Sequence, residues 1–145
     1  VTNYAKLLVS ITAKGDFKTS EKIFINFMEN IYPVTLNVKN EVMSYSLSVI
    51  ASQGLIITTP LKNAEISGMV FEKLLGQGFD ITTHKNSALI YNLACYYAVN
   101  NQKQEMLIAT KQARKRGTPI KQFLSDADFK SYWSDDNFLK TLNEN

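Results

Sequence analysis

Several residue types that mark particular classes of protein are scarce in this chain of 145 residues. It has one cysteine, Cys95, so no intramolecular disulfide can form, and one histidine, His84. A structural zinc site needs about four Cys or His ligands, which the chain does not have. A thiol or hydroxyl nucleophile would need His84 nearby as its base, with a third group to orient the histidine. We therefore expect no cofactor, no metal, no catalytic residue and no enzymatic activity.

Excess charge, long apolar runs and targeting signals are also lacking. The net charge is +3, and the hydrophobic fraction of 45% is ordinary for a folded domain. No run approaches the roughly 20 apolar residues of a membrane span. The first residues, Val1 to Tyr4, lack the charged and apolar regions of a secretion signal. The sequence predicts a cytoplasmic protein with no membrane partner, and we leave open that it is part of a longer protein.

Two clusters of like charge have simple structural explanations. The basic residues Lys111 and Arg114–Arg116 could contact phosphates, but cations at the end of a helix also complement its free carbonyl groups. We favour the second interpretation. The aspartates Asp126, Asp128, Asp135 and Asp136 do not form a calcium loop, because the glycine and glutamate that such a loop requires are absent. We expect them to cap short helices.

Apolar residues recur at helical spacing along most of the chain. We expect helices at residues 4–13, 21–31, 39–52, 61–76, 88–99 and 103–116, and short ones at 120–124 and 136–142.

Prolines, glycines and capping residues set the expected ends of these helices. Thr19 or Ser20 would cap the second helix, and Pro33 would stop it. The third would end at Gly54, the β-branched segment 55–59 would be an extended connector, and Pro60 would begin the fourth.

The first and third pairs of predicted helices share an internal spacing. The first pair reads Tyr4-x2-Leu7-Leu8-x2-Ile11, with Gly15 at its turn and Ser20-x3-Phe24 after it. The third reads Ile90-x2-Leu93-Ala94-x2-Tyr97, with Asn101 at its turn and Met106-x3-Thr110 after it. The middle pair fits this spacing only with an insertion, which we place at Gly54–Leu61. The repeat therefore predicts three helix pairs, the middle one irregular.

This spacing resembles the tetratricopeptide repeat. The run from Tyr91 to Ala98 is similar to one found in many bacterial tetratricopeptide proteins. In those proteins a capping segment follows with Asp-x-Asp-Phe and Asp-x-x-Phe elements, which resemble Asp126–Phe129 and Asp135–Phe138 here. The resemblance implies an all-α fold: a right-handed α-α superhelix of about three tetratricopeptide-like helix pairs plus short C-terminal capping helices. It implies a single domain over residues 1–145.

The resemblance also implies a protein–protein interaction module, because stacked helix pairs line a concave surface with their first helices. The partner would be another protein or a peptide. The expected contact residues on that surface are Lys6, Val9, Ala13, Tyr45, Val49, Ser52, Asn92, Cys95 and Val99. Cys95 lies in an apolar helix, so we also expect a buried, inert thiol. The alternative is an RNA-binding helical repeat similar to the pentatricopeptide family, but three irregular repeats and a charge of +3 make nucleic acid the less favoured partner.

Overall fold

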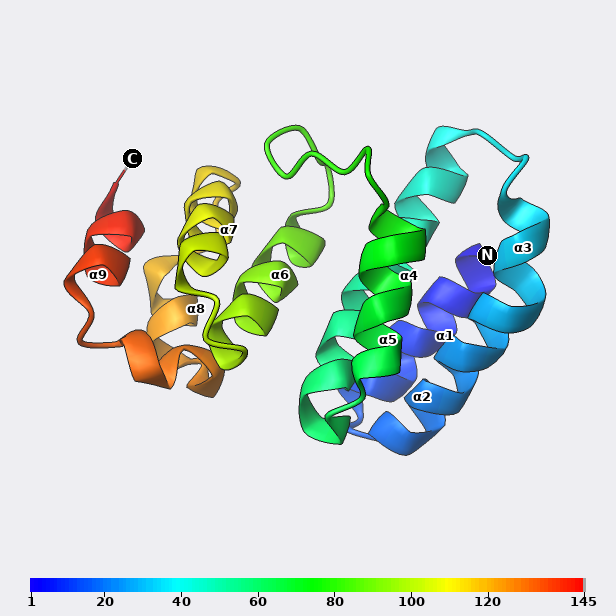
Figure 1. Ribbon diagram of the computed structural model, residues 1–145, viewed down its shortest axis with the longest axis horizontal. Helices are drawn as coiled ribbons and strands as arrows, with labels where there is room; N and C mark the ends of the chain where they lie inside the picture. Colours follow the sequence, from blue (N-terminus) through cyan, green and yellow to red (C-terminus); the bar gives the residue numbers. More distant parts are fainter. Residues whose placement is uncertain (145) are drawn as a thin grey trace. The chain divides into compact units, whose positions relative to one another are not determined.

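The computed structural model describes residues 1–144 and divides the chain into two compact units, Val1–Phe79 (unit 1) and Asp80–Asn145 (unit 2). Helices are the only regular secondary structure among the described residues, so the predicted all-α class is confirmed. Unit 1 runs from blue to green in Figure 1, and unit 2 runs from green to red. The single domain expected over residues 1–145 stays a prediction.

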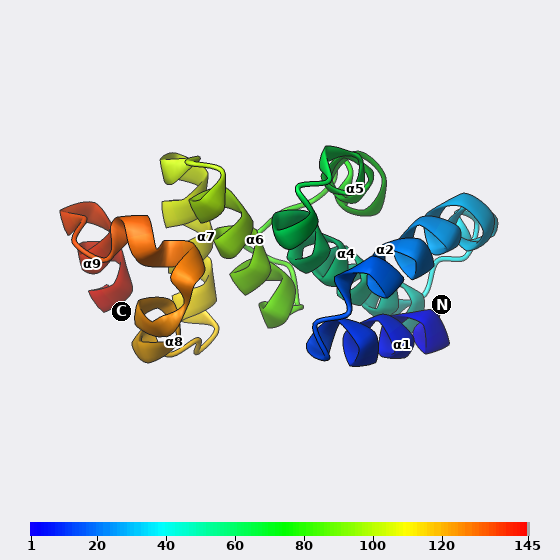
Figure 2. The same cartoon turned by 90° about the horizontal axis from the view of Figure 1, so that it is seen from below.

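Unit 1 is built from α-helices with two π-helical stretches. They are α1 (Thr2–Ala13), α2 (Phe17–Asn26), η1 (Phe27–Ile31), α3 (Tyr32–Thr35), α4 (Glu41–Leu61), α5 (Ala64–Gly68) and η2 (Met69–Leu75). The helix α1 packs against both α2 and α4 (Figures 1 and 2).

The second helix begins one turn earlier than expected. Asp16 is the N-cap of α2, and its carboxylate accepts a hydrogen bond from the backbone N–H of Thr19 at 3.1 Å. The expected cap, Thr19 or Ser20, was wrong because Asp16 directly follows the turn at Gly15, where φ is +76°. Asp is as good an N-cap as Ser, so the first capping residue after the turn begins the helix.

The largest departure from the sequence prediction is α4. Neither the helix end at Gly54 nor the extended connector at 55–59 is present, because α4 continues unbroken to Leu61. Glycine and β-branched residues lower helix propensity by about 1 kcal/mol or less each, and burial overrides this preference. The Ile57 side chain is fully buried. Residues 54–61, where we place the insertion, form the end of this long helix, and Pro60 lies in its last turn instead of beginning the next helix.

Gly54 lies where α4 passes against α2 and η2. A Cβ atom built on Gly54 would come within 2.6 Å of Cγ2 of Val70 and 2.7 Å of Cε2 of Phe24. Both neighbouring side chains are fully buried. The hydroxyl of Thr58, one turn later, donates to the Gly54 carbonyl at 2.9 Å. Gly54 therefore permits a close approach of helices rather than ending one.

Pro33 does not end the second helix as expected. The chain passes from α2 through η1 into α3, and Pro33 occupies the first turn of α3. A proline ring clashes with the carbonyl four residues before it in an α-helix. The backbone N–H of Tyr32 bonds instead to the Phe27 carbonyl, five residues back, and this wider π turn removes the clash.

Unit 2 follows the sequence prediction closely. It contains α6 (Ser87–Val99), α7 (Lys103–Lys115), α8 (Ile120–Ser125), η3 (Ala127–Tyr132) and α9 (Asp136–Asn143). The Asn86 side chain caps α6 by accepting from the Leu89 N–H at 3.1 Å. Asp126 and Asp135 cap η3 and α9 as expected, whereas Asp128 and Asp136, also expected to be caps, lie in the first turns of these helices. The 3-10 turn η3 itself was not predicted.

An aromatic cluster forms the core beneath the C-terminal helices of unit 2. The rings of Phe123 and Phe129 lie 5.1 Å apart between centroids, and those of Phe129 and Phe138 lie 5.5 Å apart. All three side chains are fully buried. Tyr91 of α6 reaches this cluster, with its ring 5.2 Å from that of Phe123. The C-terminal helices are therefore joined to α6 by a continuous apolar core.

One described helix, α4, has the length and composition of a membrane span. It has 21 residues, and its 18-residue window reaches a mean hydropathy of 1.3. The expectation that no segment approaches this length was wrong. Of that window, 56% is buried inside the protein. Length and composition alone do not separate a membrane span from the core helix of a folded domain.

Candidate binding surface

The face of α1 that lies beside α4 carries three of the predicted contact residues. The hydroxyl of Thr2, at the start of α1, is hydrogen-bonded to that of Ser46 in α4 at 3.0 Å. Lys6, Val9 and Ala13 follow Thr2 by about one, two and three turns, so they share its face of the helix. All three are exposed, Val9 by 43%. This edge of α1 is open to solvent.

The adjoining face of α4 carries an apolar row. Val42, Tyr45 and Val49 follow one another at spacings of three and four, which places them on one side of the helix. Val42 is 68% exposed and Tyr45 is 57% exposed, whereas Val49 is half-buried. Ser52, which we also predicted as a contact, is 1% exposed. We call Lys6, Val9, Val42, Tyr45 and Val49 the α1–α4 face.

Exposed apolar side chains are concentrated in the segment that leads into α4 and in its first turns. Ten large apolar residues are exposed among residues 1–144, and half of them lie within residues 34–45: Val34, Leu36, Val38, Val42 and Tyr45. Val34, Leu36 and Val38 were not among the predicted contact residues. Their alternate spacing after Pro33 was the available signal, because it matches no helix face that could bury them.

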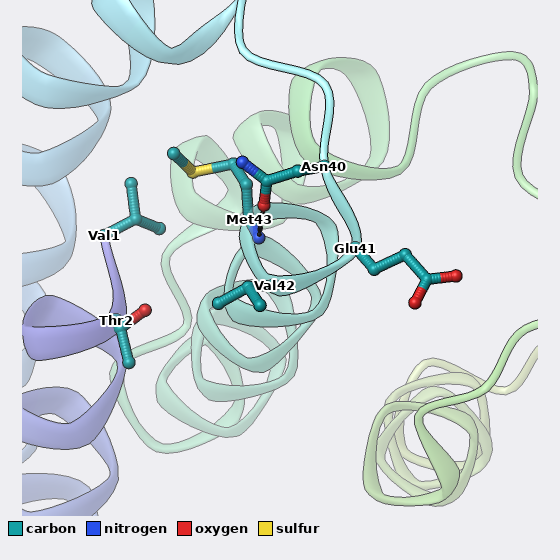
Figure 3. Close-up of a pocket in the computed structure, with 6 residues that line it drawn as sticks. All are labelled: Val1, Thr2, Asn40, Glu41, Val42 and Met43. Atoms are coloured by element: carbon teal, nitrogen blue, oxygen red, sulfur yellow. Dashed lines mark hydrogen bonds between the residues drawn. The ribbon is translucent and has the colours of Figure 1, made fainter.

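A shallow pocket lies between the first turns of α1 and α4 (Figure 3). Its volume is about 400 Å³, and its lining is Val1, Thr2, Asn40, Glu41, Val42 and Met43. The Asn40 side chain is engaged in capping α4, where it accepts from the Met43 N–H at 2.8 Å. The aliphatic side chains of Val1, Val42 and Met43 leave a recess that suits an apolar side chain.

The predicted contacts in unit 2 lie on α6 and are less accessible. Cys95 is 7% exposed, so the expected buried thiol is confirmed. Burial and the nearby carboxylates of Asp126 and Asp128 raise the pKa of this thiol well above its ordinary value, so it stays protonated at neutral pH. Asn92 and Val99 are half-buried.

Asp126 joins α6 to η3 through a set of hydrogen bonds. Its Oδ2 atom accepts from the Tyr91 hydroxyl at 2.6 Å and from the Cys95 thiol at 3.7 Å. Its Oδ1 atom accepts from the backbone N–H of Asp128 at 3.0 Å. Burial, and to a lesser degree the charge of Asp126, raises the pKa of the Asp128 carboxyl. Burial and the bond to Asp126 raise the pKa of Tyr91.

The same cluster has the geometry of a possible cation site. One ligand atom from each of Cys95, Asp126 and Asp128 lies within 4.8 Å of the others. However, Asp126 already accepts three hydrogen bonds, and the Cys95 ligand would have to lose a strongly held proton. Cys95, Asp126 and Asp128 therefore fit a hydrogen-bonded link between α6 and η3 better than a cation site. The contact between α6 and Asp126 was not predicted. The sequence signal for it is that Tyr91 and Cys95 lie one turn apart on α6, with polar atoms on the same face.

Three of the four basic residues at the end of α7 are engaged within unit 2. Arg116 donates to the carbonyls of Ile81, Thr82 and His84 at 2.8–3.2 Å. Arg114 donates to the carbonyls of Leu142 and Thr118, and Lys111 pairs with Glu144 at 3.3 Å. Both arginines therefore hold their own chain together.

Unit 1 thus presents an open apolar surface, and unit 2 holds a covered hydrogen-bonded cluster. No protein-family model, curated protein or solved structure matches this chain.

Proposed function

We propose that this chain is a protein-interaction module built from tetratricopeptide-like helix pairs. Two helix pairs support this architecture. The pairs α1–α2 and α6–α7 each have a connection of three residues, and in each the two helices pack against one another. Ala94, Ala98, Ala109 and Ala113 are nearly or fully buried in α6 and α7, as close helix packing requires. A right-handed superhelix of about three such pairs is part of the proposal.

The observation that carries the binding role is the α1–α4 face. Val9, Val42 and Tyr45 are large apolar side chains on neighbouring helices, and each is at least 43% exposed. Complete burial of such a side chain contributes roughly 1.5–3 kcal/mol. Tyrosine is also enriched among the residues that dominate binding energy. A partner that covered this face would gain a substantial part of a stable interface.

The basic residues of α7 favour a protein partner over RNA. Arg114 and Arg116 are committed to backbone carbonyls, and Lys111 is paired with Glu144. Nucleic-acid binding depends mainly on Lys and Arg contacts with phosphates. Filter binding of single-stranded RNA at low salt tests this directly, and we expect that the protein retains no RNA on the filter.

Affinity capture from a native cell extract tests the role, with the purified chain as bait and mass spectrometry as readout. The double variant Val42→Asp/Tyr45→Ala should lose the captured protein by at least tenfold, because a charge would face the apolar interface. Ile108→Asp is the matched control, since Ile108 is 55% exposed on α7 of unit 2. Circular dichroism should show that both variants fold. A partner held equally by the double variant would contradict the proposed surface.

A further inference from the structure

Lysines dominate the charge around the α1–α4 face. Lys6 belongs to the face, and Lys39 lies just before α4, three residues ahead of Val42 in the chain. Both are exposed. The segments 1–14 and 34–61, which contain α1, the apolar loop and α4, hold three lysines (Lys6, Lys14 and Lys39) against one acidic residue (Glu41). The apolar surface of unit 1 is thus accompanied by positive charge.

The shape of this surface suits a helix. Val42, Tyr45 and Val49 span about 10 Å along α4 at the rise of a helix. Val9 and Lys6 run along the neighbouring edge of α1, and Thr2 and Ser46 hold the two helices together. The side-chain ridges of a further helix can pack between those of an exposed helix such as this edge of α4. An amphipathic helix has anchors at the same spacing as this row.

An extended peptide fits this surface less well. The backbone groups within α1 and α4 are used in their own helices, so they offer no partners to an extended chain. A peptide covered there would lose water from its N–H and C=O groups without replacement. A helix satisfies its own backbone before it binds. A second copy of this chain is also disfavoured, because a twofold contact would bring the same lysine-bearing surface against itself.

We propose that the α1–α4 face binds an amphipathic helix of a partner protein whose apolar stripe is flanked by Asp and Glu residues. This inference rests on the proposed function and adds the chemistry of the partner. The apolar stripe covers Val9, Val42 and Tyr45, and the acidic flanks lie against Lys6 and Lys39. Complementary charge mainly selects the partner and speeds association, whereas the apolar contact supplies most of the affinity.

A phage-displayed library of 18-residue peptides tests this inference on the full chain. Selection on the wild type should enrich peptides with apolar residues at helical spacing and acidic residues beside them. Selection on Lys6→Glu/Lys39→Glu should enrich basic flanks instead. The matched control is Lys121→Glu/Lys140→Glu, which makes the same charge change on exposed residues of unit 2 and should select the same peptides as the wild type.

Fluorescence anisotropy with one selected acidic peptide measures the size of the effect. Reversal of Lys6 and Lys39 should weaken its binding on the order of tenfold at low salt, and added salt should reduce that difference. Val42→Asp/Tyr45→Ala should abolish binding. Selected peptides with neutral or basic flanks would overturn the inference, as would affinity unchanged by the reversal of Lys6 and Lys39.

Two results separate this inference from the proposed function. If the native partner depends on Val42 and Tyr45 but the selected peptides are not acidic, the inference fails and the protein-binding role stands. If neither the captured partner nor any peptide depends on these residues, both fail. Size-exclusion chromatography tests whether a second copy of this chain occupies the face. A dimer that Val42→Asp dissociates would assign the face to that second copy and overturn the inference.

Discussion

Replacement of Gly54 with alanine measures how closely α4 approaches α2 and η2. The added methyl carbon would lie 2.6 Å from Cγ2 of Val70 and 2.7 Å from Cε2 of Phe24. Carbon atoms pack best at about 3.5–4.0 Å. Neither neighbour can turn away into solvent, because both are fully buried. The substitution must therefore push two helices apart.

Two opposing terms set the expected magnitude for Gly54→Ala. Overpacking of a core costs about 1–3 kcal/mol. Alanine in place of glycine inside a helix gains about 1 kcal/mol. Since the methyl meets two separate neighbours, the cost should lie near its upper limit, and we expect a net loss of about 2 kcal/mol in the free energy of unfolding.

Urea unfolding followed by circular dichroism gives this free energy, and Gly68→Ala is the matched control. Gly68 is also helical, but a Cβ built on it meets nothing within 4 Å. The control should be stabilised by up to about 1 kcal/mol, so the same chemical change should have opposite signs at the two sites. A Gly54→Ala variant as stable as the wild type would refute the close crossing of α4 with its neighbours.

Three further predictions concern unit 2. Asp126→Asn removes the carboxylate that accepts from Tyr91, so urea unfolding should show a loss of about 1–3 kcal/mol in the free energy of unfolding. Asp136→Asn, at an exposed first-turn position, is the control and should lose at most about 1 kcal/mol. Equal losses would refute the role of Asp126 in joining α6 to η3. The raised pKa of Asp128 means that the folded state binds the carboxyl proton more tightly than the unfolded state does. Protonation therefore favours folding: its contribution to stability is full below the unfolded pKa of about 3.9 and is lost as the pH rises through the folded pKa. Asp128→Asn should therefore be more stable than the wild type at pH 7 and lose this advantage near pH 4, and a pH-independent difference would contradict the assignment. Iodoacetamide should label Cys95 in the native protein far more slowly than in urea, and equal rates would show that the thiol is not protected.

The helices of unit 2 were predictable because local and tertiary signals agree there. Asn86 and Asp135 stand directly before apolar helical patterns, and each caps the helix that follows. Gly117 closes α7 with a φ of +93°, a conformation that glycine adopts readily. When the cap, the periodicity and the terminator coincide, one sequence is enough to place a helix.

The course of α4 was not predictable from the same rules. Gly54 is a helix terminator in most contexts, and a β-branched segment after it favours an extended chain. Here a glycine is required by Phe24 and Val70, which lie 30 and 16 positions away along the chain. Local propensity contains no information about contacts at that distance.

The exposure of the predicted contact residues could be anticipated only in part, for a related reason. Helical spacing indicated that Lys6, Val9 and Tyr45 lie on outward-facing sides of their helices, and all three are exposed. Spacing says which residues share a face but not which part of that face another element covers. Ser52 and Cys95 share faces with predicted contacts and are nevertheless buried.

The position of α4 in the chain also has a consequence for synthesis. Its partners lie on both sides of it in sequence, since α1 and α2 precede it and η2 follows. A ribosome adds about 5–20 residues per second, so Val70 is made roughly one to three seconds after Gly54. During that interval α1 and α2 can already cover one side of α4, while the side that packs against η2 stays exposed. In a circularly permuted gene that began at α4, η2 would still follow at the same interval, but the flank that α1 and α2 cover would stay exposed until those helices were made.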